Sequence, residues 1–171
     1  KLALRLGLAL NGEIAKFTKF DRKNYFYPDL PSGYQITQFD QPIIGLGHVD
    51  VPVDGALFKV GITRAHLEAD AGKLTHPDGE DYSLVDLNRS GTPLIEIVSE
   101  PDMRTAAQAK AFAQEIYNLV RYAGVGDANL YYGNMRFDVN VSLRPEGQKE
   151  FGTRTETKNL NSFKAVKRAV E

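Results

Sequence analysis

The chain has 171 residues, of which 42% are hydrophobic and 25% charged, a balance typical of one globular domain. It contains no cysteine, which excludes a disulfide framework, a thiolate zinc site and a cysteine nucleophile. Lys and Arg total 21 against 22 Asp and Glu, and the net charge of −1 argues against a nucleic-acid clamp held by charge alone. No apolar run approaches the roughly 18 residues of a membrane span, so no membrane partner is expected.

Both ends of the chain have helical patterns. Leucines recur through residues 1–10 with no N-cap residue before them, which predicts the tail of a helix. Near the other end, Asn161 or Ser162 can cap a helix that begins at Phe163. Because a domain rarely begins and ends within helices, we expect a fragment of a longer protein. Two short terminal helices are the alternative.

Strand patterns dominate the first half of the chain between these ends. Gly55 marks a turn, and residues 57–71 are expected to be extended as far as the turn at 77–80. Residues 94–99 are almost all aliphatic, which is typical of a buried strand.

One strong helix and a hairpin follow. Thr105 and Gln108 match a capping box, and helical spacing continues to Gly124 as the C-cap. Residues 136–144 and 153–158 are two strands of a predicted hairpin. Runs of strands with few helices predict the α+β class, with a largely antiparallel sheet and flanking helices.

Two strands of this hairpin alternate polar and apolar residues. Because side chains of a strand alternate between faces, one face is apolar and the other charged. If the strands pair, their polar positions share one surface. A solvated outer face is the alternative. The polar positions are Arg136, Asp138, Asn140, Ser142 and Arg144 in the first strand, and Arg154, Glu156 and Lys158 in the second.

Carboxylates also occur in two earlier strands. Glu68 belongs to an alternating run with Arg64, His66 and Asp70, and Glu96 stands among aliphatic residues. A carboxylate in a buried strand is unfavourable unless it is paired or binds a metal. A salt bridge to an arginine is the alternative for Glu96.

Carboxylates beside cations are typical of sites for Mg²⁺ and polyphosphate. Mg²⁺ takes one or two carboxylates together with phosphate oxygens, and Lys and Arg suit the phosphates. The four candidate carboxylates are Glu68, Glu96, Asp138 and Glu156. A P-loop, a dinucleotide fingerprint, zinc-ligand spacing and a serine nucleophile elbow are all absent from the sequence.

An aromatic cluster lies near the N-terminus, at Tyr25, Phe26, Tyr27 and Tyr34. Such a cluster can stack nucleobases. Packing in the core or at an interface between chains is the alternative, since aromatic residues dominate both.

Five blocks of the sequence resemble signatures of the B subunits of the aspartyl/glutamyl-tRNA(Asn/Gln) amidotransferases. The similar blocks lie at residues 19–29, 83–89, 94–102, 136–144 and 158–163. The resemblance extends over essentially the whole chain, and five separate blocks rarely match by chance.

This resemblance implies that residues 1–171 are part of a catalytic domain with the antiparallel fold of glutamine synthetase and the guanidino kinases. It implies a first strand with a Gly-Leu-Glu-x-His motif before Lys1. It also implies helical and tail domains that bind tRNA after Glu171.

The implied enzyme is a carbon–nitrogen ligase that uses ATP and Mg²⁺. ATP phosphorylates the side-chain carboxylate of glutamate or aspartate misacylated onto tRNA, and ammonia from glutamine then displaces the phosphate. The implied partners are the A and C subunits of the amidotransferase and misacylated tRNA, in the bacterial cytoplasm or, in a eukaryote, the mitochondrial matrix. The alternative is a scaffold fragment that binds the other subunits and has no activity, and the net charge of −1 disfavours a stand-alone tRNA binder.

Matching positions supply the expected site residues. The metal positions are Glu68, Glu96, Asp138 and Glu156, and Lys23 matches a lysine of the reaction pocket near the ammonia path. The charged strand faces add Arg136, Asn140, Arg154 and Lys158 as catalytic residues, and Arg64, His66 and Lys73 are assigned to ATP binding. The family usually has Glu, a typical metal ligand, where this chain has Ala69.

Overall fold

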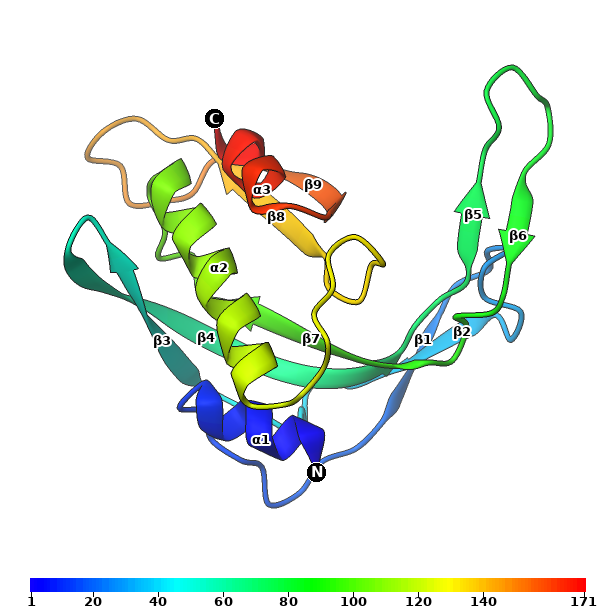
Figure 1. Cartoon of the computed structure of the whole chain (residues 1–171), viewed down its shortest axis with the longest axis horizontal. Coiled ribbons are helices and arrows are strands. Elements are labelled where there is room, and N and C mark those ends of the chain that lie inside the picture. The colour runs from blue at the N-terminus through cyan, green and yellow to red at the C-terminus, as the bar shows by residue number, and fades with distance from the viewer.

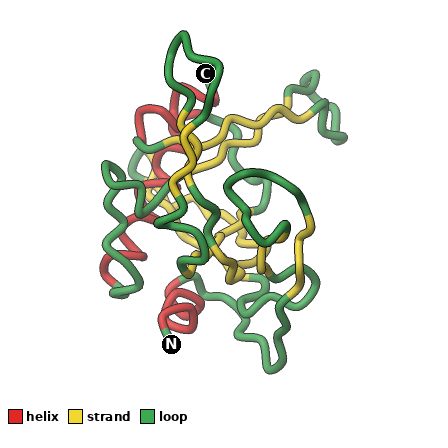
Figure 2. Tube along the Cα trace, turned by 90° about the vertical axis from the view of Figure 1, so that its right-hand side faces the viewer, coloured by secondary structure: helices red, strands yellow, loops and turns green.

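Three helices and nine strands make up the computed structural model, which describes all residues from 1 to 171 (Figure 1). The helices are α1 (Leu2–Ala9), α2 (Ala106–Tyr122) and α3 (Phe163–Val170). The strands are β1 (Asp21–Asn24), β2 (Tyr34–Thr37), β3 (Gly47–Val53), β4 (Ala56–Ala69), β5 (Lys73–Thr75), β6 (Leu84–Asp86), β7 (Pro93–Ser99), β8 (Phe137–Ser142) and β9 (Arg154–Leu160). The three helices gather on one side of the strands in Figure 2.

The central sheet has the order β3–β4–β7, and both pairings are antiparallel. The β3–β4 turn consists of Asp54 and Gly55, whose φ values of 49° and 81° suit a two-residue hairpin turn. The first half of β4 pairs with β3, and its second half pairs with β7 after a register shift between Ile62 and Arg64. The long strand β4 therefore connects the core of the domain to the edge where β7 lies.

The main core forms where α1 and α2 meet the first half of β4. Leu6 and Leu10 of α1 and Val60 and Ile62 of β4 are fully buried, and Ile116 of α2 joins the same cluster. Figure 1 shows α2 crossing the sheet with its C-terminal end beside α1. Burial of these apolar side chains is the main favourable contribution to folding.

Three two-stranded hairpins complete the fold: β1–β2, β5–β6 and β8–β9. The β8–β9 hairpin contacts α3 and α2 through a second cluster around Ala113 and Val166. The β5–β6 hairpin extends away from the other elements (Figure 1). The α+β class with antiparallel pairing is thus confirmed, although the predicted sheet is divided into four small ones.

The predictions for the terminal helices are confirmed. α1 begins at Leu2, and Lys1 before it makes no side-chain capping hydrogen bond. Ser162 caps α3, because its side chain accepts the N–H of Ala165. None of the helices is both long and apolar enough to cross a lipid bilayer.

The capping box of α2 is also confirmed, with Thr105 and Gln108 each accepting a backbone N–H of the other. The predicted C-cap is wrong by one residue. Ala123 is the C-cap, and Gly124 follows it with φ of 60°. The left-handed conformation belongs one position beyond the C-cap, where glycine adopts it without strain.

Two predictions about burial are wrong. Strand β7 lies at the edge of the sheet, and the Glu96 side chain is 52% exposed rather than buried. Phe26 and Tyr27 do not belong to the core, since they are 91% and 54% exposed on the loop between β1 and β2. An alternation or an aromatic run shows which residues are apolar, but neighbouring segments decide which of them are covered.

Candidate functional site

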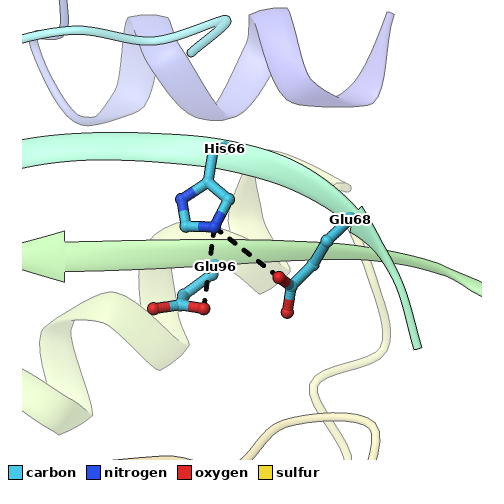
Figure 3. A group of neighbouring side chains, drawn as sticks. All are labelled: His66, Glu68 and Glu96. Atoms are coloured by element: carbon cyan, nitrogen blue, oxygen red, sulfur yellow. Dashed lines mark ion pairs between the residues drawn. The ribbon is translucent and has the colours of Figure 1, made fainter. Parts of the chain in front are cut away.

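Three side chains that can hold a metal ion meet on the β4–β7 pair (Figure 3). His66 and Glu96 are direct cross-strand partners, and Glu68 lies two residues further along β4 on the same face. Nε2 of His66 is 3.7 Å from Oε2 of Glu68 and 3.7 Å from Oε2 of Glu96. Figure 3 shows all three side chains extending from the strands on the side away from α1. We call this set the His66 group.

The His66 group is buried at one end and open at the other. The side chains of His66 and Glu68 are 5% and 11% exposed, whereas that of Glu96 is 52% exposed. Two carboxylates this close repel each other, and burial reduces the screening of their charge by water. A cation placed between them therefore stabilises the arrangement, and solvent can reach it from the side of Glu96.

The protonation of His66 is set by its neighbour Arg64. Nε of Arg64 donates a hydrogen bond of 3.3 Å to Nδ1 of His66. In the neutral ring, Nδ1 is then the acceptor and Nε2 carries the proton, which faces the two carboxylates. The two carboxylates fit Mg²⁺ as they stand. His66 fits only if its proton moves to Nδ1 and the bond from Arg64 is released.

The β1–β2 hairpin fixes the neighbouring carboxylate. The hydroxyl of Thr37 donates to Oε2 of Glu68 at 3.2 Å, and Nε2 of Gln35 donates to the carbonyl of Ala69 at 2.9 Å. These bonds hold the hairpin against the end of β4. Strand alternation places the Ala69 side chain on the face opposite Glu68.

Gln38, which is only 2% exposed, connects the same hairpin to β4 from below the surface. Its Oε1 accepts the N–H groups of Leu67 at 2.9 Å and Ile43 at 3.2 Å. Its Nε2 donates to the Thr18 hydroxyl and to the carbonyl of Lys19. Neither Thr37 nor Gln38 had a signal in the sequence, because both act across long separations along the chain.

Lys23 of β1 is exposed, and its Nζ lies 5.7 Å from the centre of the Tyr25 ring. Burial raises the pKa of the Tyr25 hydroxyl above 10.0, and the charges of Asp29 and Glu68 raise it further. Tyr25 therefore stays neutral at physiological pH and keeps its proton. The influence of Glu68 shows that this part of the β1–β2 hairpin lies close to the His66 group.

A second polar cluster joins β4 to β8. Oδ2 of Asp70 lies 2.9 Å from Nε of Arg89, off the line of the N–H bond, so this contact is an ion pair without a hydrogen bond. Nη2 of Arg136 lies 3.3 Å from both oxygens of Asp70. Asp70 was not predicted as a site residue, although its place in the alternating run with His66 was a signal. Arg136, predicted as catalytic, is held by this carboxylate.

Asp138 and Glu156 do not join the His66 group. Asp138 accepts the backbone N–H of Asn159 at 2.8 Å, and Glu156 lies 3.5 Å from Nζ of Lys158. Asn140 is paired with Glu156 across the hairpin, as predicted. The expectation that four carboxylates meet at one point is wrong for these two, because β7 and β8 belong to separate sheets.

Two other predicted positions also lie outside the group. Arg154 begins β9 opposite Ser142 and is exposed. Lys73 begins β5 opposite Asp86 and is exposed on the extended hairpin. The structure therefore gathers Glu68, Glu96 and His66, with Arg64 in contact, from the predicted set.

The sequence matches one protein family along its whole length. A family model described as the GatB/GatE catalytic domain covers residues 1–171. The chain belongs to this family. The predicted resemblance is thereby confirmed, and the His66 group is a feature of a GatB/GatE catalytic domain.

Relatives of this GatB/GatE domain include bacterial and plant proteins. The chain is 59% identical over 169 residues to the B subunit of the aspartyl/glutamyl-tRNA(Asn/Gln) amidotransferase of Staphylococcus epidermidis, covering 99% of this chain and 35% of that protein. It is 59% identical over 173 residues to the B subunit of the chloroplastic/mitochondrial glutamyl-tRNA(Gln) amidotransferase of Sorghum bicolor, covering 99% of this chain and 32% of that protein. For the B subunit from Pseudomonas syringae the identity is 56% over 171 residues, covering 99% and 36%. The chain thus spans about a third of the length of these relatives.

Proposed function

We propose that this chain activates the side-chain carboxylate of an aminoacyl-tRNA for amidation, as part of the B subunit of a tRNA-dependent amidotransferase. The substrate is glutamyl-tRNA(Gln), aspartyl-tRNA(Asn) or both. Family membership and the names of the relatives support the reaction class. The observation that carries the proposal is the pair of carboxylates, Glu68 and Glu96, held beside His66 at a partly open face.

The reaction needs an activated carboxylate because oxide is a poor leaving group. A carboxylate oxygen of the substrate attacks the γ-phosphorus of ATP, the bond to the ADP oxygen breaks, and an acyl phosphate forms. Ammonia then attacks the acyl carbon, phosphate leaves with its electron pair, and the nitrogen loses a proton to give the amide. Phosphoryl transfer of this kind depends on positioning and charge neutralisation, which a sheet of charged side chains can supply.

The chain's own residues prepare a place for these charges. Thr37 orients Glu68, and Arg64 holds the imidazole of His66. Glu68 and Glu96 present oxygens toward the same point. Mg²⁺ held by these carboxylates, with His66 after its proton moves, supplies positive charge beside the phosphates.

The remaining predicted roles belong to the same proposal. Asp138 and Glu156 are proposed as further metal ligands on the β8–β9 hairpin. Lys23 is proposed to lie near the path of ammonia. Phosphate contacts are proposed for Arg136, Asn140, Arg154 and Lys158, and ATP contacts for Arg64, His66 and Lys73. For Arg136 this role requires release from Asp70, to which it is bound here.

The proposed partners are misacylated tRNA and the A and C subunits of the amidotransferase, the first of which releases ammonia from glutamine. The relatives are named as subunits, which supports assembly with other chains. Their sources, bacteria and a plant organelle, support the bacterial cytoplasm or an organelle matrix as the location.

The test uses the full-length protein in its reconstituted complex. Replacing Glu68 with Gln is expected to lower ATP-dependent amide formation on misacylated tRNA, and ADP release with it, by about 100-fold. Glu80→Gln is the matched control, because Glu80 is exposed at the turn of the β5–β6 hairpin. Equal rates for both variants and the unchanged protein would remove the His66 group from the mechanism.

A scaffold without catalytic activity is the second candidate. The positions of Asp138 and Glu156 outside the His66 group favour it. Calorimetric titration of the complex with ATP and Mg²⁺ separates the two: heat that disappears in Glu68→Gln supports a site, and identical heats in both proteins support the scaffold. Asp138→Ala and Glu156→Ala with unchanged amide formation would leave the hairpin with a structural role alone.

A further inference from the structure

A separate cavity of about 860 Å³ lies at the C-terminal end of α2, and none of its lining residues belongs to β4 or β7. It is enclosed by the last turns of α2, the segment that leads to β8 (Figure 1) and the ring of Phe163. Its volume is in the range of small-ligand sites, roughly 300–1,000 Å³. Its lining includes Tyr117, Arg121, Asn129, Tyr131, Tyr132 and Asn134.

Two tyrosine rings stand at the edge of this cavity. Tyr131 and Tyr132 are 88% and 76% exposed, and their ring centres lie 5.2 Å apart in an edge-to-face arrangement. The backbone beneath them is fixed, because Oδ1 of Asn129 accepts the N–H groups of both tyrosines at 2.9 and 3.1 Å. The backbone N–H of Asn134 closes the same turn on the carbonyl of Asn129. Large flat surfaces are thus presented to solvent from an ordered turn.

Two guanidinium groups reach the same edge. Nη1 of Arg121 donates to the hydroxyl of Tyr117 at 2.8 Å, and its guanidinium lies 5.6 Å from the centre of that ring. Arg5 of α1 approaches Gly124, with Nη1 3.5 Å from the position a Cβ atom would take there. Asp127 adds one negative charge to the lining.

We propose that this cavity binds one nucleotide unit. The base stacks on Tyr131 or Tyr132, the amides of Asn129 and Asn134 contact its polar edge, and Arg121 with Arg5 faces the phosphate. Stacking on aromatic rings is tolerant of base identity, whereas guanidinium groups match phosphate geometry. A protein interface would place apolar side chains at the centre, but amides, a carboxylate and a guanidinium line this cavity.

The nucleotide has two possible sources, free ATP or an unpaired nucleotide at the end of an RNA strand. The choice between these sources rests on the proposed function, since both are substrates of that reaction. The experiment therefore measures both in parallel. It uses the full-length protein in its complex, with a fluorescent ATP analogue and a fluorescein-labelled single-stranded RNA of eight nucleotides as probes.

The informative variant replaces Tyr131 and Tyr132 with Ala. We expect weaker binding of one probe by about 5- to 150-fold, the effect of losing one or more stacked bases. The Tyr131→Phe, Tyr132→Phe variant keeps the rings and is expected to bind like the unchanged protein. Tyr82→Ala is the control, because Tyr82 is exposed on the β5–β6 hairpin, outside the cavity.

Loss of RNA binding alone assigns the cavity to RNA, and loss of ATP binding alone assigns it to ATP. Unchanged affinity for both probes overturns the inference. So does a failure of the complex to assemble without a change in either affinity, which would mark a protein interface. Probe binding is also measured in Glu68→Gln, so a failure of the proposed reaction is recorded separately from a failure of this cavity.

Discussion

The charged face of the β4–β7 pair is covered, whereas that of the β8–β9 hairpin is open to solvent. His66 and Glu68 are 5% and 11% exposed, but Glu156 and Lys158 are 36% and 67% exposed. The β1–β2 hairpin packs over the first face through Thr37. The β8–β9 hairpin instead contacts α2 and α3 through its apolar side.

The difference shows that a charged strand face becomes a site when a second element restricts its side chains. On the covered face, each oxygen or nitrogen has few alternatives to its present contact, and the charges interact strongly. On the open face, an ion pair such as Glu156–Lys158 is screened by water and contributes little. The following variants test this comparison.

The largest expected effect is in the core beneath the covered face. Ile62 of β4 is fully buried, and Ile62→Ala is expected to lower the free energy of unfolding by about 2–5 kcal/mol, because it leaves a cavity. Val141→Ala, in the half-buried β8, serves as the matched change and should cost about 1 kcal/mol or less. Urea unfolding measures both, and equal losses would contradict the comparison.

The buried amide that holds the β1–β2 hairpin comes next. Gln38→Leu keeps the approximate size but leaves the N–H groups of Leu67 and Ile43 without an acceptor. We expect a loss of about 2 kcal/mol in the free energy of unfolding. Gln35→Leu removes a single hydrogen bond to the carbonyl of Ala69 and should cost less. The reverse order would show that Gln38 does not anchor the hairpin.

A smaller effect is expected where β4 meets β8. Asp70→Asn weakens the ion pairs with Arg89 and Arg136, whose side chains are 36% and 28% exposed. Because solvent screens part of this interaction, we expect a loss of about 1 kcal/mol that shrinks as salt is raised. Thermal unfolding at low and high ionic strength measures it. A loss that does not depend on salt would assign the effect to packing instead of charge.

The smallest effect concerns the titration of Tyr25. Glu68→Gln removes one of the charges that raise the pKa of Tyr25, so this pKa should fall toward 10.0 while burial keeps it raised. The folded protein keeps this proton where the unfolded chain loses it, so the contribution of Tyr25 to stability decreases as pH rises above about 10. Ultraviolet titration follows the phenolate, with Tyr25→Phe identifying its signal. An unchanged pKa in Glu68→Gln would separate Tyr25 from the site.

Much of the local structure was predictable because it depends on residues close in the chain. The capping box at Thr105 and Gln108, the turn at Gly55 and the β8–β9 hairpin follow from local hydrogen bonds and backbone preferences. The exposure of Glu96 was not predictable, since an edge strand and a central strand can have the same aliphatic composition.

The sequence by itself determined the family, the α+β class and the residue types able to bind a cation and phosphates. Only the tertiary structure decided that Glu68 and Glu96 meet at His66 while Asp138 and Glu156 do not. The physical reason is that alternation assigns a side chain to a face of its own strand, whereas strand pairing and register decide which faces come together. The pairing of His66 with Glu96 arises from such a long-range contact.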